Sequence, residues 1–415
     1  MLKRNLYLSR IAPFYDSTSI KFLVGIRSSG KGSIFNQIIE DLKNSNKADS
    51  SHIIYINLEF LDNDKIRENT TFINYIKKKI TDTKMYYLFL KEIQYLPKFE
   101  ISLIELLKTY DNISIFASCS NSRILLKNLN SNIRKACKIF YITPLSYVET
   151  CKFLNTTPKN RQMLLNYLKY GGFPNRLVCK KSSEVKRYLY SLLDSIFLRD
   201  IVMRLGISDI DNMNDITKCV VQHIGKTFHI EDVKKSFAKL DKTISDVQLY
   251  NGIDCLSQAL LIHGVNNYNV KTNIECHGIA RYYIGDLGLR FIYGLDIENN
   301  MDAILKNLIW LELKRRGYEV YTGINGDKTF DFVAIRHGKY MYIQVLYLIE
   351  DGNTANVEIE KLSNFDFNGK RYILSLDDCD YSRKGVIHKN IIDFILEGED
   401  DIQSPDEPET WIAVE

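Results

Sequence analysis

The chain has 415 residues and a mass of 48.3 kDa, a length that predicts about two to four domains rather than one core. Its 45% hydrophobic and 12% aromatic content is typical of a globular protein and excludes global disorder. The formal net charge is +4, but the last nineteen residues contain eight acids and no Lys or Arg, so the first 396 residues carry +12. Such a basic body allows a polyanionic partner, although most basic surfaces are simply solvated.

Several classes of protein are excluded by short patterns. The longest apolar runs, such as 85–90, have the length of a strand and are too short to cross a membrane. The first five residues are followed by no apolar segment, so we expect no signal peptide. The eight cysteines contain no C-x-x-C pair, which predicts reduced thiols and no zinc site. These features favour a cytoplasmic protein without a membrane partner.

The first 145 residues alternate between strand and helix patterns. Apolar runs predict strands at 20–25, 52–58, 86–90, 113–118 and 138–142. Amphipathic segments predict helices at 31–43, 72–80 and 101–110. Because the strands are apolar on both faces, they predict an α/β fold in which helices cover a parallel sheet.

The rest of the chain divides by pattern into three segments and a tail. Residues 146–205 are helical, and residues 206–295 combine short helices with a hairpin at 265–283. Residues 296–396 follow the order helix, hairpin, strand, helix, strand and helix, which predicts a second, small α/β domain. Residues 397–415 form an acidic tail without periodicity, which we expect to be flexible.

A glycine-rich loop lies between the first predicted strand and the first predicted helix. Its sequence, Gly25-Ile-Arg-Ser-Ser-Gly-Lys31, fits the G-x-x-x-x-G-K pattern in the strand–loop–helix context that this pattern requires. Glycines let the backbone curl around phosphates, the helix N-terminus attracts the anion, and the lysine reaches the terminal phosphates. The predicted nucleotide-binding residues are Gly25, Ile26, Arg27, Ser28, Ser29, Gly30, Lys31, Gly32 and Ser33.

Both positions that hold Mg²⁺ in such sites carry unsuitable residues. Gly32 stands where a Ser or Thr hydroxyl binds the metal, and Ser33 follows one residue too late to replace it. After the strand at 86–90, Lys91 stands where an acid holds the metal's water shell, while Glu92 remains as the candidate base. We therefore assign no metal ligands and expect weak or absent ATP hydrolysis.

Nine short stretches of the sequence occur together in a characteristic order and spacing. They are 24–31, 88–94, 120–122, 143–146, 170–174, 195–202, 282–290, 311–318 and 331–333. In these stretches the chain resembles bacterial and archaeal AAA-superfamily P-loop ATPases with a C-terminal domain of unknown function that has a restriction-endonuclease-like fold. The resemblance implies that Glu92 positions the attacking water and that Asn121 senses the γ-phosphate.

The same resemblance implies an architecture for the whole chain. It comprises an AAA-type P-loop nucleotide-binding domain at 1–145, a helical lid at 146–205, a winged-helix-like domain at 206–295, a restriction-endonuclease-like α/β domain at 296–396 and the acidic tail at 397–415. The family often carries Gly-Arg shortly before the 143–146 stretch as an arginine finger. Here that place is Lys135-Ala136 with Arg134 displaced, so we do not predict a finger.

The nuclease pattern of the C-terminal segment is also incomplete. Glu312 and Asp331 follow the order used by restriction-type nucleases, but Gln344 and Leu346 replace the acid and the lysine expected on the next strand. Lys306 stands where family members often show a glutamate. We therefore expect this domain to be inactive as a nuclease.

Three functions remain open on sequence grounds. The leading one is an ATP- or ADP-binding AAA-type protein that regulates contact with an unknown protein partner. The others are a scaffold that binds no nucleotide and a DNA-binding adaptor. For the adaptor, the candidate recognition helix 246–258 carries no Lys or Arg, and the lysines before it are typical of a solvated face: Lys234, Lys235, Lys239 and Lys242.

Lys91 itself has two interpretations. The simpler one is that it is a relic, left after hydrolysis was lost and the acid became dispensable. The other is that its ammonium group neutralises the β- and γ-phosphate oxygens in place of magnesium, although a point charge does not reproduce the geometry of a metal.

Overall fold

The computed structural model describes residues 2–60, 65–122, 136–203, 210–295, 297–349, 352–363 and 368–400. They form two compact units. The first comprises Met1–Thr143 with Gln258–Leu260, and the second begins at Pro144 and contains the remaining described residues. Arg134 and Lys135, at the place where the resembled family carries its arginine finger, and the residues from 401 onward lie outside the described residues.

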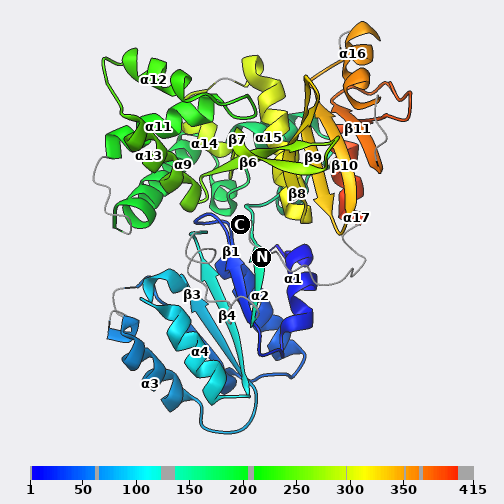
Figure 1. The fold of residues 1–415 in the computed structure, drawn as a ribbon. Helices are drawn as coiled ribbons and strands as arrows, with labels where there is room; N and C mark the ends of the chain where they lie inside the picture. Colours follow the sequence, from blue (N-terminus) through cyan, green and yellow to red (C-terminus); the bar gives the residue numbers. More distant parts are fainter. Residues whose placement is uncertain are drawn as a thin grey trace. The chain divides into compact units, whose positions relative to one another are not determined.

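The first unit is built on a sheet of five parallel strands in the order β2-β3-β4-β1-β5 (Figure 1). The strands are β1 (Ile20–Val24), β2 (Ile53–Asn57), β3 (Tyr86–Lys91), β4 (Ile113–Cys119) and β5 (Cys137–Tyr141). Every residue of β1 and β4 is buried, as expected for strands that are covered on both faces. The predicted parallel sheet is therefore confirmed.

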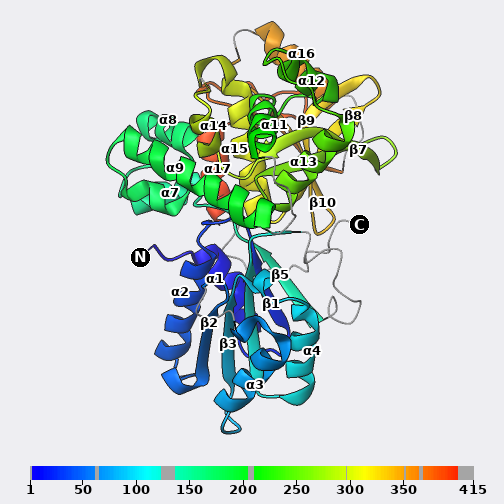
Figure 2. The same ribbon diagram turned by 90° about the vertical axis from the view of Figure 1, so that its left-hand side faces the viewer.

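Helices cover both faces of this sheet (Figure 2). They are α1 (Asn5–Ile11), α2 (Lys31–Asn44), α3 (Asn69–Lys79) and α4 (Phe99–Thr109), with short 3₁₀ turns at Ala12–Phe14, Ser50–His52 and Ile93–Tyr95. Leu23 packs in one core with side chains of α1 and α2. The ring of its neighbour Phe22 lies 6.2 Å from that of Phe99 on α4. Alternate residues of β1 thus anchor the helices on opposite faces.

The second unit contains a mixed sheet of seven strands in the order β12-β11-β10-β9-β8-β6-β7 (Figure 1). The strands are β6 (Ile262–Asn269), β7 (Ile274–Ile284), β8 (Glu319–Asn325), β9 (Lys328–Arg336), β10 (Lys339–Val345), β11 (Gly369–Ser375) and β12 (Ile387–Asn390). The predicted hairpin is present as β6 and β7, and β6 pairs with β8 in parallel. One sheet therefore runs across the predicted boundary at residue 295, and a division of the chain there stays a prediction.

The second unit also contains helices, some of which pack on this sheet. They are α7 (Tyr147–Phe153), α8 (Arg161–Tyr170), α9 (Ser182–Ile196), α11 (Ile210–Gln222), α12 (Ile230–Ala238), α13 (Asp246–Gln258), α14 (Gly288–Ile292), α15 (Met301–Arg316), α16 (Gly352–Ser363) and α17 (Ile391–Asp400), with 3₁₀ turns at Pro174–Val178 and Glu298–Asn300 and a π-helix at Phe197–Val202. Side chains of α15 and α17 share one core with the sheet, while α16 belongs to a core that contains Phe330 and Tyr342. In the described part of the chain, no helix is long and apolar enough to span a membrane.

Helix α17 extends four residues into the segment predicted as a flexible tail, because it ends at Asp400. The apolar residues Ile391, Phe394 and Ile395 bury one side of this helix in the core of the second unit. The prediction of a flexible tail from residue 397 was therefore wrong for its first four residues.

Two glycine-containing segments of the second unit meet at Asp286. The N–H of Gly172 donates to Asp286 Oδ2 at 2.7 Å, and the N–H of Gly288 donates to Oδ1 at 2.8 Å. Gly171 has φ +72°, and a Cβ at this position would lie 1.8 Å from Asp286 Oδ1. Burial raises the pKa of Asp286 to about 7, although these hydrogen bonds and Arg176 act in the opposite direction. The 170–174 and 282–290 stretches, far apart in the sequence, are therefore in direct contact in the second unit.

Candidate functional site

The glycine-rich loop connects β1 to α2, as the sequence predicts. Gly30 adopts φ +99° as the N-cap of α2, and Ser28 adopts φ +64°. A Cβ at Gly25 would lie 2.0 Å from the carbonyl oxygen of Ile142, so this position accepts only glycine. The sequence therefore forms the tight strand-to-helix turn that the G-x-x-x-x-G-K pattern predicts.

Lys31 begins α2 and is almost fully buried at 4% exposure. Its ammonium group donates to the carbonyl oxygens of Gly25 at 2.8 Å and Ile26 at 3.1 Å, and it lies 3.8 Å from Glu92 Oε1. Binding of a phosphate at this loop requires Lys31 to exchange these acceptors for phosphate oxygens. The adjacent Ser29 hydroxyl is buried and has no hydrogen-bond partner among the described residues.

Glu92 follows β3 and is positioned by neighbouring side chains. Its Oε2 atom accepts hydrogen bonds from Gln94 Nε2 at 2.5 Å and Ser120 Oγ at 2.8 Å. Burial alone would raise the pKa of Glu92, but Lys31, Arg27 and these two donors lower it to about 2. Glu92 is therefore a carboxylate at neutral pH, suited to orienting a water rather than to removing its proton completely.

Asn121 lies at the carboxyl end of β4 and is 1% exposed. Its backbone N–H donates to Cys119 Sγ at 3.4 Å. Because β1, β3 and β4 are parallel neighbours, their carboxyl ends share one edge of the sheet. The structure thus places the loop, Glu92 and Asn121 at that edge.

Some residues at this edge escaped the sequence analysis. Arg4 is buried and donates from Nη1 to the carbonyl oxygens of Ser29 at 3.1 Å and Thr143 at 2.9 Å, which ties the loop to the segment after β5. Arg27 of the predicted loop forms an ion pair with Glu59 at 2.5 Å. Neither Arg4 nor Glu59 belongs to a short motif, so no local pattern could have identified them.

The two substituted metal positions are direct neighbours. A Cβ built on Gly32 would have one neighbouring heavy atom within 4 Å, Lys91 Cε at 3.9 Å. A site for Mg²⁺ needs oxygen ligands, but these two positions present a bare backbone and an ammonium group. In the part of the chain that the structure describes, no group of three His, Cys, Asp or Glu side chains could hold a metal ion. Neither of the two substituted positions therefore fits Mg²⁺.

The nuclease-like residues of the second unit are all engaged in internal contacts. Asp331 Oδ1 pairs with Arg281 at 2.6 Å and with Lys306 at 2.9 Å, and the backbone N–H of Asp331 donates to Gln344 Oε1 at 3.1 Å. Glu312 pairs with both Arg315 and Arg316 of the same helix. Neither carboxylate is therefore available as it stands to hold a metal.

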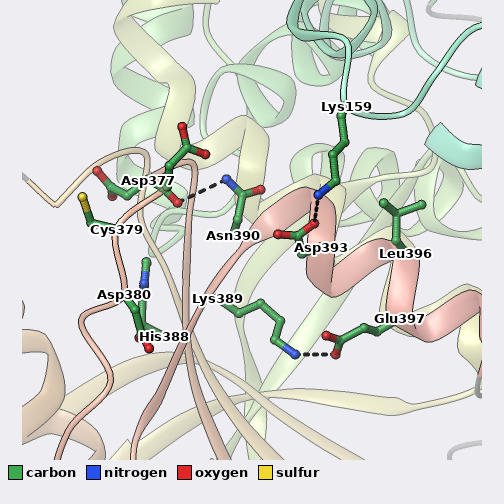
Figure 3. Close-up of a pocket in the computed structure, with 11 residues that line it drawn as sticks. Lys159, Asp377, Cys379, Asp380, His388, Lys389, Asn390, Asp393, Leu396 and Glu397 are labelled. Carbon is green, nitrogen blue, oxygen red and sulfur yellow. Dashed lines mark hydrogen bonds and ion pairs between the residues drawn. The ribbon is translucent and has the colours of Figure 1, made fainter.

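A separate hollow of about 480 Å³ lies between α17 and the segment that follows β11 (Figure 3). It is lined by Lys159, Asp377, Asp378, Cys379, Asp380, His388, Lys389, Asn390, Asp393, Leu396 and Glu397. Lys159 pairs with Asp393 at 2.9 Å, and Lys389 pairs with Glu397. His388 Nε2 lies 2.8 Å from Ser375 Oγ, and its Nδ1 accepts from the N–H of Tyr381. These contacts describe a self-satisfied polar network rather than a reactive centre.

Two family models match the chain. Residues 17–151 match the model described as an AAA domain, and residues 161–299 match a domain of unknown function, DUF8612. The first match contains the glycine-rich loop, Glu92 and Asn121. It confirms the AAA-type P-loop part of the predicted architecture. The winged-helix-like and restriction-endonuclease-like parts stay predictions.

Two relatives extend over most of the chain. An uncharacterized protein of Haemophilus influenzae is 26% identical over 381 residues, which cover 90% of this chain and 93% of that protein. The uncharacterized protein MJ1544 of Methanocaldococcus jannaschii is 29% identical over 351 residues, which cover 80% of this chain and 76% of that protein.

Among solved structures, a Walker-type ATPase of Pyrococcus abyssi aligns with 71% of this chain and 96% of its own length, with 12% identity and a TM-score of 0.49. The ORC2 protein of Aeropyrum pernix, solved as ADPNP–ADP complexes, aligns with 75% of this chain and 92% of its own length, with 11% identity and a TM-score of 0.40.

Proposed function

We propose that the first unit binds ATP or ADP in the loop from Gly25 to Ser33 and that this binding regulates contact with a protein partner. The observation that carries the proposal is the loop itself, in which left-handed Gly30 precedes the buried Lys31 at the start of α2. The unpartnered Ser29 hydroxyl and the N-terminus of α2 add donors for a phosphate. Glu92 and Asn121 would face the terminal phosphate from the neighbouring strands.

Hydrolysis of the bound nucleotide is expected to be weak or absent. Glu92 is available to orient a water, but neither Gly32 nor Lys91 offers an oxygen ligand to the metal that normally neutralises the developing charge. A nucleotide that is held and not turned over suits a binding-regulated protein better than a motor. Release of inorganic phosphate from ATP by the purified chain measures this directly, and rapid turnover would contradict the expectation.

Ion pairing in the second unit weakens the DNA-adaptor alternative. Lys234 pairs with Asp246 at 2.5 Å, Lys242 with Asp215 at 2.5 Å, and Lys235 with Asp232 at 3.6 Å. Lysines that already face carboxylates release fewer counterions from DNA than unpaired ones. We therefore favour the nucleotide as the polyanion that this basic chain binds.

A thermal-shift experiment separates nucleotide binding from a scaffold that binds none. We expect ATP and ADP to stabilise the chain, by about 2.7 kcal/mol when the ligand is at 100 times its dissociation constant. Lys31→Ala should remove the shift, whereas Lys43→Ala, an exposed lysine on the same helix, should retain it. No stabilisation at millimolar nucleotide, or an unchanged shift in Lys31→Ala, would contradict the proposal.

A further inference from the structure

Lys91 brings a positive charge to the place from which a metal-holding acid is missing. Its Cε atom lies 3.9 Å from the Cβ position of Gly32, and the ammonium nitrogen is one bond of about 1.5 Å further on. The side chain is half-buried against the first turn of α2 rather than extended into solvent. Among the described residues, no hydrogen bond or ion pair engages this ammonium group.

The electrostatic surroundings of Lys91 are unfavourable in the absence of an anion. The N-terminus of α2 carries a partial positive charge, and a cation near it is destabilising by about 0.3–1 kcal/mol. Lys31 contributes a second ammonium group at the start of the same helix. The carboxylate of Glu92 already lies beside the ammonium group of Lys31 rather than pairing with Lys91. Arg27 is paired with Glu59. A polyphosphate would neutralise the excess positive charge that Lys91 adds to this edge.

The second unit contains an analogous replacement. Lys306 stands at a position where the resemblance led us to expect an acid, and its ammonium group lies 2.9 Å from Asp331 Oδ1. There Lys306, together with Arg281, neutralises the buried carboxylate of Asp331. A lysine side chain thus serves as a resident counter-ion at an independent position of the chain.

We propose that the Lys91 ammonium group is the resident counter-ion of the β- and γ-phosphates, so that this site accepts metal-free ATP or ADP. The inference rests on the proposed nucleotide binding and specifies the chemical form of the ligand. The relic interpretation, which was simpler on sequence grounds, predicts instead that Lys91 contributes nothing to phosphate binding.

Calorimetric titration with ATP in buffer containing either Mg²⁺ or EDTA tests the inference. We expect the dissociation constants of the unchanged chain in the two buffers to agree within about threefold. Lys91→Met keeps most of the apolar stem but removes the charge, and it should weaken binding in EDTA at least tenfold, or about 1.4 kcal/mol. Lys108→Ala, an exposed lysine on α4, serves as the matched control and should bind like the unchanged chain.

The possible failures of this experiment are distinguishable. If ATP binding requires Mg²⁺, the proposed role of Lys91 is wrong. The same holds if Lys91→Met, with the melting temperature of the unchanged chain, binds ATP in EDTA as tightly as the unchanged chain does. Either outcome leaves the proposed function intact. Absence of binding in both buffers overturns the proposed function and the inference with it.

Discussion

Gly32 and Lys91 lie 59 residues apart in the sequence but are neighbours at the carboxyl edge of the five-stranded sheet. A Ser at position 32 would fit, because the added Cβ meets only Lys91 Cε at an ordinary contact distance of 3.9 Å. Glycine at this position is therefore not required by the backbone. The absence of a hydroxyl there is best explained together with the lysine that faces it.

The double change Gly32→Ser and Lys91→Asp should restore both metal contacts. Because Glu92 remains positioned by Gln94 and Ser120, we expect ATP binding to become dependent on Mg²⁺ and phosphate release to rise. Colorimetric phosphate assays with and without Mg²⁺ measure the effect, with Gly32→Ser alone as the control. If the double variant gains neither property, more of the site than these two positions has changed.

Asp286 gives stability a pH dependence with a definite sign. Its folded-state pKa of about 7 lies above the ordinary value of 3.8, so its contribution is fully present below pH 3.8 and is lost as the pH rises toward 7. Between pH 3.8 and pH 7 we expect the unfolding free energy of the unchanged chain to decrease. The decrease should exceed that of the Asp286→Asn variant by roughly 1–4 kcal/mol. Denaturant titrations at several pH values measure the slope. Asp378→Asn, an exposed acid, should keep the slope of the unchanged chain.

At the scale of elements, the turn after α8 depends on glycine for two separable reasons. Gly171 has φ +72° and ψ −166°, a conformation that side chains strongly disfavour, and it also touches Asp286. Gly338, in the turn between β9 and β10, has φ +70°, and no heavy atom lies within 4 Å of the position that a Cβ would take there. The comparison of these two glycines separates backbone strain from close packing.

Gly171→Ala should therefore be much more destabilising than Gly338→Ala. We expect about 1–2 kcal/mol for Gly338→Ala from the left-handed backbone alone, and at least twice that loss for Gly171→Ala because the new methyl group overlaps Asp286. Urea denaturation of the two variants measures the difference. Equal losses would show that the second unit accommodates the methyl group without cost.

The elements of the first unit were predictable because local patterns determine them. The runs at 20–25 and 86–90 are apolar on both faces and become β1 and β3 with boundaries shifted by no more than one residue. The loop was recognisable from its spacing together with the strand before it and the helix after it. The pairing of β6 with β8 was not predictable, because it joins segments separated by α15 and leaves no local signal. Arg4 reaches Ser29 through a similarly long-range contact.

At the scale of the whole molecule, the described residues form two units with separate sheets. All the candidate nucleotide contacts belong to the first unit, and the buried α15 anchors the core of the second. Hydrogen exchange with and without ATP should therefore show protection concentrated at 25–33 and at the ends of β3 and β4. Amides in the middle of α15 should keep their rates. Protection that spares residues 25–33 would place the ligand elsewhere.

The central claim is that the loop from Gly25 to Ser33 holds a nucleotide whose phosphates are neutralised by Lys91. Its most direct test is a crystal structure of the chain grown with ATP or ADP in the presence of EDTA. The account predicts density for phosphates in the loop, with Lys91 Nζ within hydrogen-bonding distance of a terminal phosphate oxygen and no metal between them. A loop without phosphate density at saturating nucleotide, or phosphates bound with Lys91 turned away, would contradict it.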